Sequence, residues 1–215
     1  MLRLAVLLLP ALGSAQHAQT PYTVTFDVSL GPGRKNASID VEVHPEWAPL
    51  GAGRFRELMD AEFFHDVRFF RVIKGFMAQF GISGDPALSA QYAKLALKDD
   101  PVTQSNARGT LSFATAGPNT RTTQLFVNLV DNTMLDSQGF APFAKVADKS
   151  MDVIDRLYGG YGEGAPDGNG PAQDRIEHEG NSYLTEHFPK LSWIEGVRFN
   201  REATAQQTSR LALEW

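Results

Sequence analysis

Arg71 stands in a setting that calls for a chemical explanation. The stretch RFFRVIKGFMAQFG, residues 68 to 81, places its guanidinium among phenylalanine, valine, isoleucine and methionine side chains. Moving a cation out of water is costly unless the charge is paired or hydrogen-bonded, and an arginine in a protein does not lose its proton. We therefore expect Arg71 either to have a structural partner or to offer its charge to a ligand that binds and leaves.

Three short segments each combine a polar side chain with a large apolar one. Side chains alternate between the two faces of a strand, so residues two positions apart share a face. The pattern fits a groove for a ligand, and it equally fits an internal polar network that holds a β-domain together. By this rule the residues that share a face are Arg71 with Phe69 and Ile73, Gln79 with Met77, and Gln124 with Phe126.

Alternation and turn residues predict the elements that must position these side chains. Strands are expected at 22–30, 37–43, 67–73, 76–81, 109–115, 123–130, 140–146 and 191–199. Apolar residues at helical spacing predict helices within 48–64 and 149–158, and 88–97 is a candidate for a third, short one. Many short strands with two clear helices favour one closed β-domain, because a barrel leaves no exposed sheet edge. The glycine-rich segment 159–171 is expected to be a flexible loop.

Composition excludes several classes of protein. The chain has 215 residues, of which 42% are hydrophobic and 21% charged, as in an ordinary globular protein. Its formal net charge of −5 does not suit nucleic-acid binding, which depends on neutralising phosphates. The sequence contains no cysteine, which excludes disulfides, thiolate catalysis and thiolate metal sites.

The N-terminus has the pattern of a secretory signal peptide. Arg3 precedes an apolar core at 4–12, and small residues follow up to Ala15, after which we expect cleavage. The core is shorter than the roughly 20 residues that span a bilayer; an uncleaved interfacial anchor is the alternative. The expected divisions are a signal peptide at 1–15, one domain at 21–199 and a C-terminal tail at 200–215. The mature protein should be exported to a periplasm, a secretory lumen or the outside, without a membrane span.

Three other kinds of site find no support. The segment GYGEGA at 160–165 matches a relaxed dinucleotide fingerprint, but a helix precedes it and Pro166 follows it, whereas the fingerprint needs a strand before and a helix after. The five histidines show no paired spacing typical of metal ligands. No G-x-S-x-G motif of a serine hydrolase is present. We therefore expect no metal and no cofactor.

The segments FFRVIKGFMAQFG, GTLSFATAGPNTRTTQLFVNL and LDSQGFAPFAKV resemble the cyclophilins, a family of peptidyl-prolyl cis-trans isomerases. The resemblance runs in order from about Tyr22 to Gly160 and rests on specific motifs, above all AGPNT followed by a Gln-x-Phe pair. It implies an all-β fold: a closed eight-stranded antiparallel β-barrel capped by two α-helices.

The resemblance also implies the roles of individual residues. Arg71 matches the catalytic arginine, and Gln79 matches a glutamine that acts beside it and holds the peptide backbone. The positions that match substrate-binding residues are Phe76, Met77, Ala114, Thr115, Ala116, Gln124, Phe126, Met134, Leu135 and Phe140.

Four positions depart from the family's pattern. Thr115 stands where asparagine is usual, but that contact is made by the main chain, so threonine should serve. Phe70 and Phe140 replace histidines, which we expect to affect which peptides enter. Met134 stands where some members have a tryptophan associated with cyclosporin binding. We therefore expect weak cyclosporin binding with retained isomerase activity.

The sequence thus predicts a monomeric isomerase that accelerates rotation about X-Pro bonds and assists the folding of exported proteins. Its partners would be proline-containing peptides and unfolded client proteins. Two alternatives stay open: a proline-peptide binding module of the same fold with little catalysis, and a purely structural barrel without peptide affinity. Acceleration of X-Pro isomerisation distinguishes an enzyme from the binding module. Binding of proline-containing peptides excludes the purely structural barrel.

Overall fold

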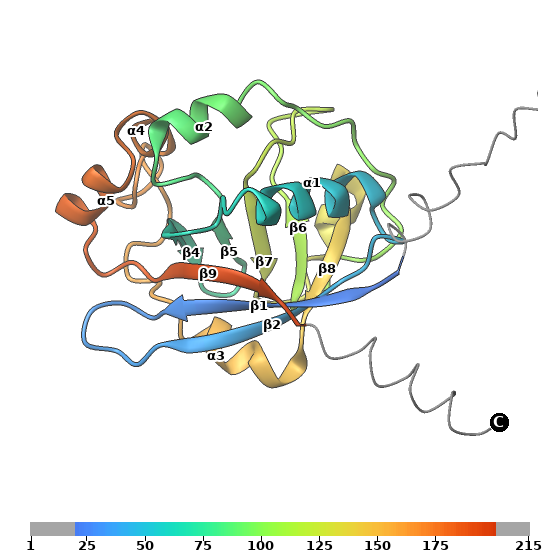
Figure 1. Cartoon of the computed structure of the whole chain (residues 1–215), viewed down its shortest axis with the longest axis horizontal. Helices are drawn as coiled ribbons and strands as arrows, with labels where there is room; N and C mark the ends of the chain where they lie inside the picture. The colour runs from blue at the N-terminus through green and yellow to red at the C-terminus, as the bar shows by residue number, and fades with distance from the viewer. Residues whose placement is uncertain (1–19, 201–215) are drawn as a thin grey trace, which may run out of the picture.

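A computed structural model describes residues 20–200 of the chain (Figure 1). The predicted signal peptide and all but the first residue of the predicted tail lie outside the described residues. The described strands form one antiparallel sheet in the order β3-β9-β1-β2-β8-β6-β7-β5-β4. Their bounds are β1 Tyr22–Ser29, β2 Ala37–Val43, β3 Val67–Arg68, β4 Arg71–Ile73, β5 Met77–Phe80, β6 Thr110–Phe113, β7 Leu125–Asn128, β8 Pro142–Val146 and β9 Trp193–Phe199.

The sheet differs from the expected barrel in two ways. It has nine described strands where eight were expected, and β3 and β4 end the strand order without pairing with each other, so the barrel is open. The expected single strand 67–73 causes both differences, because it divides into β3 and β4 at Phe69 and Phe70. Phe69 packs into the main core, whereas Phe70 packs with Ile176 and Leu184 in a second cluster.

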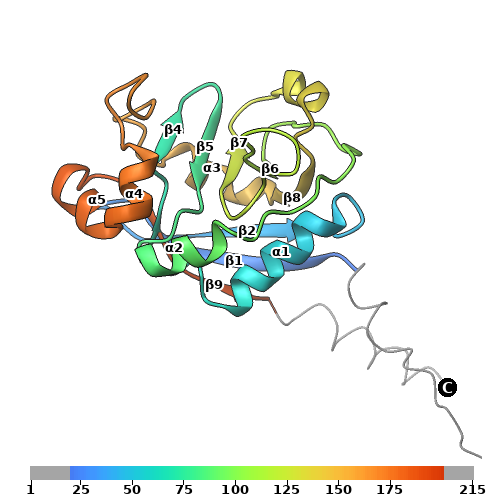
Figure 2. The same ribbon diagram turned by 90° about the horizontal axis from the view of Figure 1, so that it is seen from above.

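More helices are described than the two that the sequence clearly predicted. Helices α1 and α3 fall within the predicted segments, α2 overlaps the candidate segment 88–97 but begins before it, and α4 and α5 were not predicted. Figure 2 shows α4 and α5 beside α2, at the end of the molecule that carries β4. The helices are α1 Pro49–Asp60, α2 Pro86–Tyr92, α3 Met151–Asp155, α4 Gln173–Glu179 and α5 Asn181–His187, with 3-10 turns η1 Thr133–Gln138 and η2 Asp148–Ser150.

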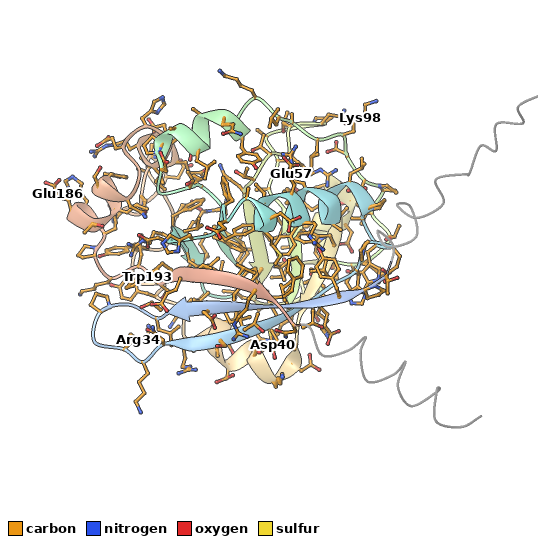
Figure 3. The ribbon with its side chains drawn as sticks, in the orientation of Figure 1. Arg34, Asp40, Glu57, Lys98, Glu186 and Trp193 are labelled. Atoms are coloured by element: carbon orange, nitrogen blue, oxygen red, sulfur yellow. The ribbon has the colours of Figure 1, made fainter. Side chains whose placement is uncertain are left out.

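The β1–β2 hairpin is the scaffold of one half of the sheet. Its register pairs Tyr22 with Val43 and Val28 with Ala37, and residues 30–36 connect the two strands. In Figure 1, α1 lies above this hairpin and α3 below it. Phe55 and Leu58 of α1 are fully buried, and side chains fill the space between α1 and the strands (Figure 3). The expected amphipathic helix is therefore confirmed.

The N-terminus of α1 is capped by a residue far away in sequence. Ala48, at the cap position, offers no side-chain acceptor, so the Asp100 carboxylate accepts the backbone N–H of Leu50 at 2.9 Å and that of Gly51 at 2.8 Å. Asp100 also pairs with Arg121 at 3.1 Å, and both side chains are at most 3% exposed. The buried carboxylate is thus satisfied, as a buried charge must be.

Alternation along β5 and β7 separates the core from an outer face. Ala78 and Phe80 of β5 and Val127 of β7 belong to the main hydrophobic core. Met77 of β5 and Phe126 of β7 belong instead to a small separate cluster on the opposite face of the sheet. The sheet therefore presents a second apolar surface, outside its core.

Candidate active site

A groove of about 470 Å³ lies on this outer face. It is lined by all but one of the predicted site residues, the exception being Met134. The sequence pattern that predicted a shared face for Met77 with Gln79 and for Gln124 with Phe126 is confirmed. The lining residues are Arg71, Phe76, Met77, Gln79, Ala114, Thr115, Ala116, Thr120, Thr122, Gln124, Phe126, Leu135, Phe140, Glu163, Asp167 and Gln173.

One part of the groove is an apolar wall. Met77, Phe126 and Leu135 form its buried base. The ring of Phe140 stands edge-on to that of Phe126, with 5.6 Å between centroids and an interplanar angle of 77°, an arrangement that aromatic pairs favour. Such a wall can hold a small apolar ring and keep water away from it.

Asn106 fixes the segment that carries Leu135 and Phe140. Its side chain is fully buried. Its Nδ2 donates to the Phe140 carbonyl and to the Asp136 carboxylate, each at 2.8 Å. Sequence reasoning did not find this residue, because nothing near it in the chain indicates that it contacts a segment 30 positions away.

Arg71 and Gln79 form the polar part of the groove. They lie opposite each other in the β4–β5 register, across a turn in which Gly75 adopts a φ of +78° that favours glycine. Arg71 Nη1 donates to Gln79 Oε1 at 3.0 Å, and Gln79 Nε2 donates to Gln124 Oε1 at 2.8 Å. The guanidinium is only 23% exposed, so Arg71 is held by hydrogen bonds at the groove surface.

Glu163 is a second partner of Arg71 that sequence reasoning missed. Its carboxylate accepts from Arg71 Nε at 2.6 Å and from Nη2 at 2.7 Å, which is a bidentate ion pair. The hydrogen bonds from Arg71 lower the pKa of Glu163, and the backbone N–H of Gly164 adds to this effect. The sequence indicated only a flexible loop at this position.

Small residues and a turn form the opposite rim. The backbone N–H of Ala114 donates to the Gln124 carbonyl at 2.9 Å, and that of Ala116 donates to Thr120 Oγ1 at 2.9 Å. Thr115 bonds to Thr120 through its side-chain hydroxyl at 2.9 Å and to the Gly117 carbonyl. The threonine therefore uses its side chain inside the turn, so its main chain remains the part that a peptide can contact.

Three residues lie elsewhere than the sequence suggested. Phe69 does not share a face with Arg71, since it is buried in the main core. Phe70 is buried under α4 and α5 with Ile176 and Leu184 and does not line the groove, so an effect on peptide entry through direct contact is wrong for this residue. Met134 is 55% exposed on η1.

Within residues 20–200, no group of three or more histidine, aspartate or glutamate side chains gathers as metal ligands would. Among the same residues, no helix has both the length and the apolar character that crossing a bilayer requires. The polar side chains that line the groove include the Arg71 guanidinium, the amides of Gln79 and Gln124 and the Glu163 carboxylate, beside the apolar wall.

Comparisons with known proteins identify the family. The family model described as "Cyclophilin type peptidyl-prolyl cis-trans isomerase/CLD" matches residues 25–180. A peptidyl-prolyl cis-trans isomerase of Acinetobacter baylyi is 31% identical over 163 residues, covering 73% of this chain and 82% of the relative. Peptidyl-prolyl cis-trans isomerase B of Escherichia coli is 32% identical over 145 residues, covering 63% and 84%.

A solved structure supports the fold. The crystal structure of a cyclophilin-type isomerase of Cryptosporidium parvum matches with a TM-score of 0.58 and 17% identity, over 84% of this chain and 98% of that one. At this identity the similarity shows the fold, and the family follows from the sequence matches. The chain belongs to the cyclophilin-type peptidyl-prolyl cis-trans isomerases.

Proposed function

We propose that this isomerase accelerates rotation about X-Pro bonds in proteins that fold after export, with Arg71 as its catalytic residue. One observation carries the catalytic assignment: a hydrogen-bonded, half-buried guanidinium shares one groove with an apolar wall. The cyclophilin family binds proline-containing peptides, and this groove offers both parts that such a peptide needs, a surface for the ring and donors for its polar atoms.

The reaction requires no bond to form or break. A peptide bond resists rotation because the nitrogen lone pair is delocalised into the carbonyl, which gives a barrier of about 18–20 kcal/mol. X-Pro bonds nevertheless isomerise within tens to hundreds of seconds, slowly enough to limit folding. In the twisted state the nitrogen becomes pyramidal and its lone pair accepts a hydrogen bond. A group that donates to this nitrogen only in the twisted state lowers the barrier.

Arg71 suits this task because its charge is permanent and no proton is transferred. The wall of Met77, Phe126 and Leu135 would hold the proline ring and exclude water, which strengthens the field of the guanidinium. Gln79 and Gln124 would hold the neighbouring peptide carbonyl while it rotates. In this scheme the apolar residues chiefly determine binding, and Arg71 determines the rate.

An isomerisation assay on an X-Pro peptide, followed by NMR exchange between the cis and trans signals, tests the catalytic assignment. We expect the wild-type protein to accelerate exchange and Arg71→Ala to lose about a hundredfold in kcat/KM, which corresponds to about 3 kcal/mol of transition-state stabilisation. Full activity of Arg71→Ala would contradict the assignment. Peptide binding by the wild type without acceleration would instead identify a binding module.

The proposed role in export rests on the sequence pattern of residues 1–15, with Arg3 before an apolar core and Ala15 at the expected cleavage site. We propose unfolded exported proteins as clients. Mass spectrometry of the protein expressed with its leader and recovered from the export compartment should show Gln16 as the first residue. A protein that keeps Met1 and remains on the cytoplasmic side would contradict this part of the proposal.

Weak cyclosporin affinity and a monomeric state complete the proposal. The first is supported by Met134, which occupies the position of the tryptophan associated with cyclosporin binding in some family members. Analytical ultracentrifugation of the mature protein tests the second, for which we expect a single species of monomer mass.

A further inference from the structure

The ion pair between Arg71 and Glu163 joins the groove to the glycine-rich loop. The two residues are 92 positions apart, and both guanidinium contacts are short, at 2.6 and 2.7 Å. The side chains are 23% and 37% exposed. An arginine–carboxylate pair of this kind fixes the plane of the guanidinium as well as its position.

The loop is folded around the backbone of Glu163. The N–H of Gly170 donates to the Glu163 carbonyl at 2.7 Å, and the N–H of Gly168 donates to Gly164 at 2.9 Å. A Cβ atom at Gly168 would lie 2.3 Å from the Glu163 carbonyl oxygen, and one at Gly170 would lie 2.7 Å from it. Only glycine allows this close approach, so two of the glycines hold the backbone of residue 163.

The base of the loop is packed against the strand that carries Arg71. Gly159 lies against Val72 of β4, where an added Cβ would meet the Val72 carbonyl at 3.4 Å. The ring of Tyr161 stands edge-on to that of Phe188, with centroids 5.0 Å apart. Gly159 and Tyr161, which make these contacts, lie only a few positions before Glu163 in the chain. The contacts therefore hold the Glu163 carboxylate in a defined place beside β4.

The hydrogen bonds of Arg71 to oxygen atoms use three of its five N–H donors. Arginine has five N–H donors. Glu163 takes one from Nε and one from Nη2, and Gln79 takes one from Nη1. The two remaining hydrogens belong to Nη1 and Nη2, where Nη1 has one further, long contact of 3.9 Å with the sulfur of Met77. Glu163 lines the groove and leaves it open.

We infer that Glu163 is a positioning residue, which holds the guanidinium of Arg71 through Nε and Nη2 so that the N–H groups not taken by Glu163 and Gln79 face the prolyl nitrogen. The inference rests on the catalytic role proposed for Arg71. It assigns a function to the glycine-rich loop, which the sequence left without one. Removing the carboxylate should let the guanidinium rotate, and this should lower the rate more than it weakens peptide binding.

The chain contains a matched ion pair for comparison. Arg175 donates to Glu179 from Nε at 2.6 Å and from Nη2 at 2.8 Å, with nearly the geometry of the Arg71–Glu163 pair. Both residues lie on the exposed surface of α4, and neither lines the groove. Glu179→Gln therefore removes the same chemical contact without touching the groove.

The test measures kcat and KM for X-Pro isomerisation in the wild type, Glu163→Gln, Glu179→Gln and Arg71→Ala, with thermal unfolding of each. We expect Glu163→Gln to lower kcat about tenfold while KM changes less than about twofold. Glutamine keeps the size of the side chain but offers one acceptor in place of two. Glu179→Gln should match the wild type, and all four proteins should unfold at similar temperatures.

Several outcomes would overturn the inference. An unchanged kcat in Glu163→Gln would show that the pair does not position Arg71, and an increased kcat would identify Glu163 as an inhibitor of the arginine. A lower kcat that accompanies a large fall in unfolding temperature would assign Glu163 a structural role. Full activity of Arg71→Ala would instead refute the proposed catalytic residue itself, so the two failures can be told apart.

Discussion

Arg71 and Gln79 are paired residues of adjacent antiparallel strands, and a 3.0 Å hydrogen bond joins their side chains. Their proximity therefore depends on the register of β4 and β5. A slip of one residue would turn Arg71 toward the core. The turn at Lys74 and Gly75, which sets this register, therefore helps to place Arg71 in the groove.

The chemistry of Arg71 predicts a graded response to substitution. Arg71→Lys keeps the charge but loses the planar fork that binds Glu163 and Gln79 together. We expect it to retain more activity than Arg71→Ala but less than about a tenth of the wild-type kcat/KM. Exchange NMR with one X-Pro peptide compares the three proteins, and a fully active Arg71→Lys would show that charge alone suffices.

Gln79 and Gln124 should act as a unit. Gln79 bonds to both Arg71 and Gln124, so Gln79→Ala should lower kcat/KM by about tenfold and Gln124→Ala by less. Because residues in one hydrogen-bond network are coupled, the double variant should lose less than the product of the two single losses. Strictly multiplicative losses would mean that the 2.8 Å contact between the two amides has no catalytic effect.

Isomerase activity should fall in acid as Glu163 becomes protonated. The hydrogen bonds from Arg71 lower its pKa, so the carboxylate form, and with it both activity and the pair's contribution to stability, should persist below the pH at which an ordinary glutamate is protonated. Both are lost as the pH falls through the lowered pKa. The charged residues that line the groove are Arg71, Glu163 and Asp167.

A pH–kcat profile measured by exchange NMR tests this expectation, since that method needs no coupling protease. Glu163→Gln is the control, because its profile should stay flat where the wild-type rate declines. An acid decline of equal size in both proteins would assign the effect to a group other than Glu163.

Asp100 should be important for stability and not for catalysis. Asp100→Ala leaves two N–H groups of α1 without their cap and Arg121 without its buried partner. We expect the free energy of unfolding to fall by about 3 kcal/mol, as measured by urea denaturation. Asp148→Ala, at an aspartate that is 89% exposed, should change it by less than about 0.5 kcal/mol.

Cyclosporin affinity should depend on residue 134. Met134 is exposed beside Leu135, which lines the groove, so a tryptophan there has room to contact a bound ligand. We expect Met134→Trp to bind cyclosporin at least about tenfold more tightly than the wild type in isothermal titration calorimetry, a gain of about 1.4 kcal/mol. Tight binding by the wild type would refute the proposal.

Much of the fold followed from local alternation in the sequence, which also placed Gln79 beside Met77 and Gln124 beside Phe126, whereas the other groove residues followed from the resemblance to the cyclophilins. The β1–β2 hairpin, the strand segments around Gln79 and Phe126 and the buried face of α1 have periods that can be read within a few residues. The break at Phe69 and Phe70 cannot be read this way, since both are good strand formers. Phe70 packs with Ile176 and Leu184, which lie far along the chain, and no local pattern shows this contact.

Glu163 could not be predicted for a different reason. It lies in a segment without periodicity, and its partner is 92 residues away, so no local pattern connects them. The one available signal was that an arginine among apolar residues needs an anion, while the glycine-rich loop carries one in GYGEGA. That signal alone does not select Glu163 among the acidic residues of the chain.

Gly168 and Gly170 enclose the backbone carbonyl of residue 163, while the Glu163 carboxylate accepts one hydrogen bond from the loop, from the N–H of Gly164 at 2.9 Å. The course of the loop is therefore largely independent of which side chain stands there, whereas an alanine at position 168 or 170 would displace the backbone. A single substitution at position 163 can therefore change the charge beside Arg71 while the backbone of the loop keeps its course. This separation makes the groove adjustable during evolution or engineering at a single position, while Gly168 and Gly170 leave no room for a side chain.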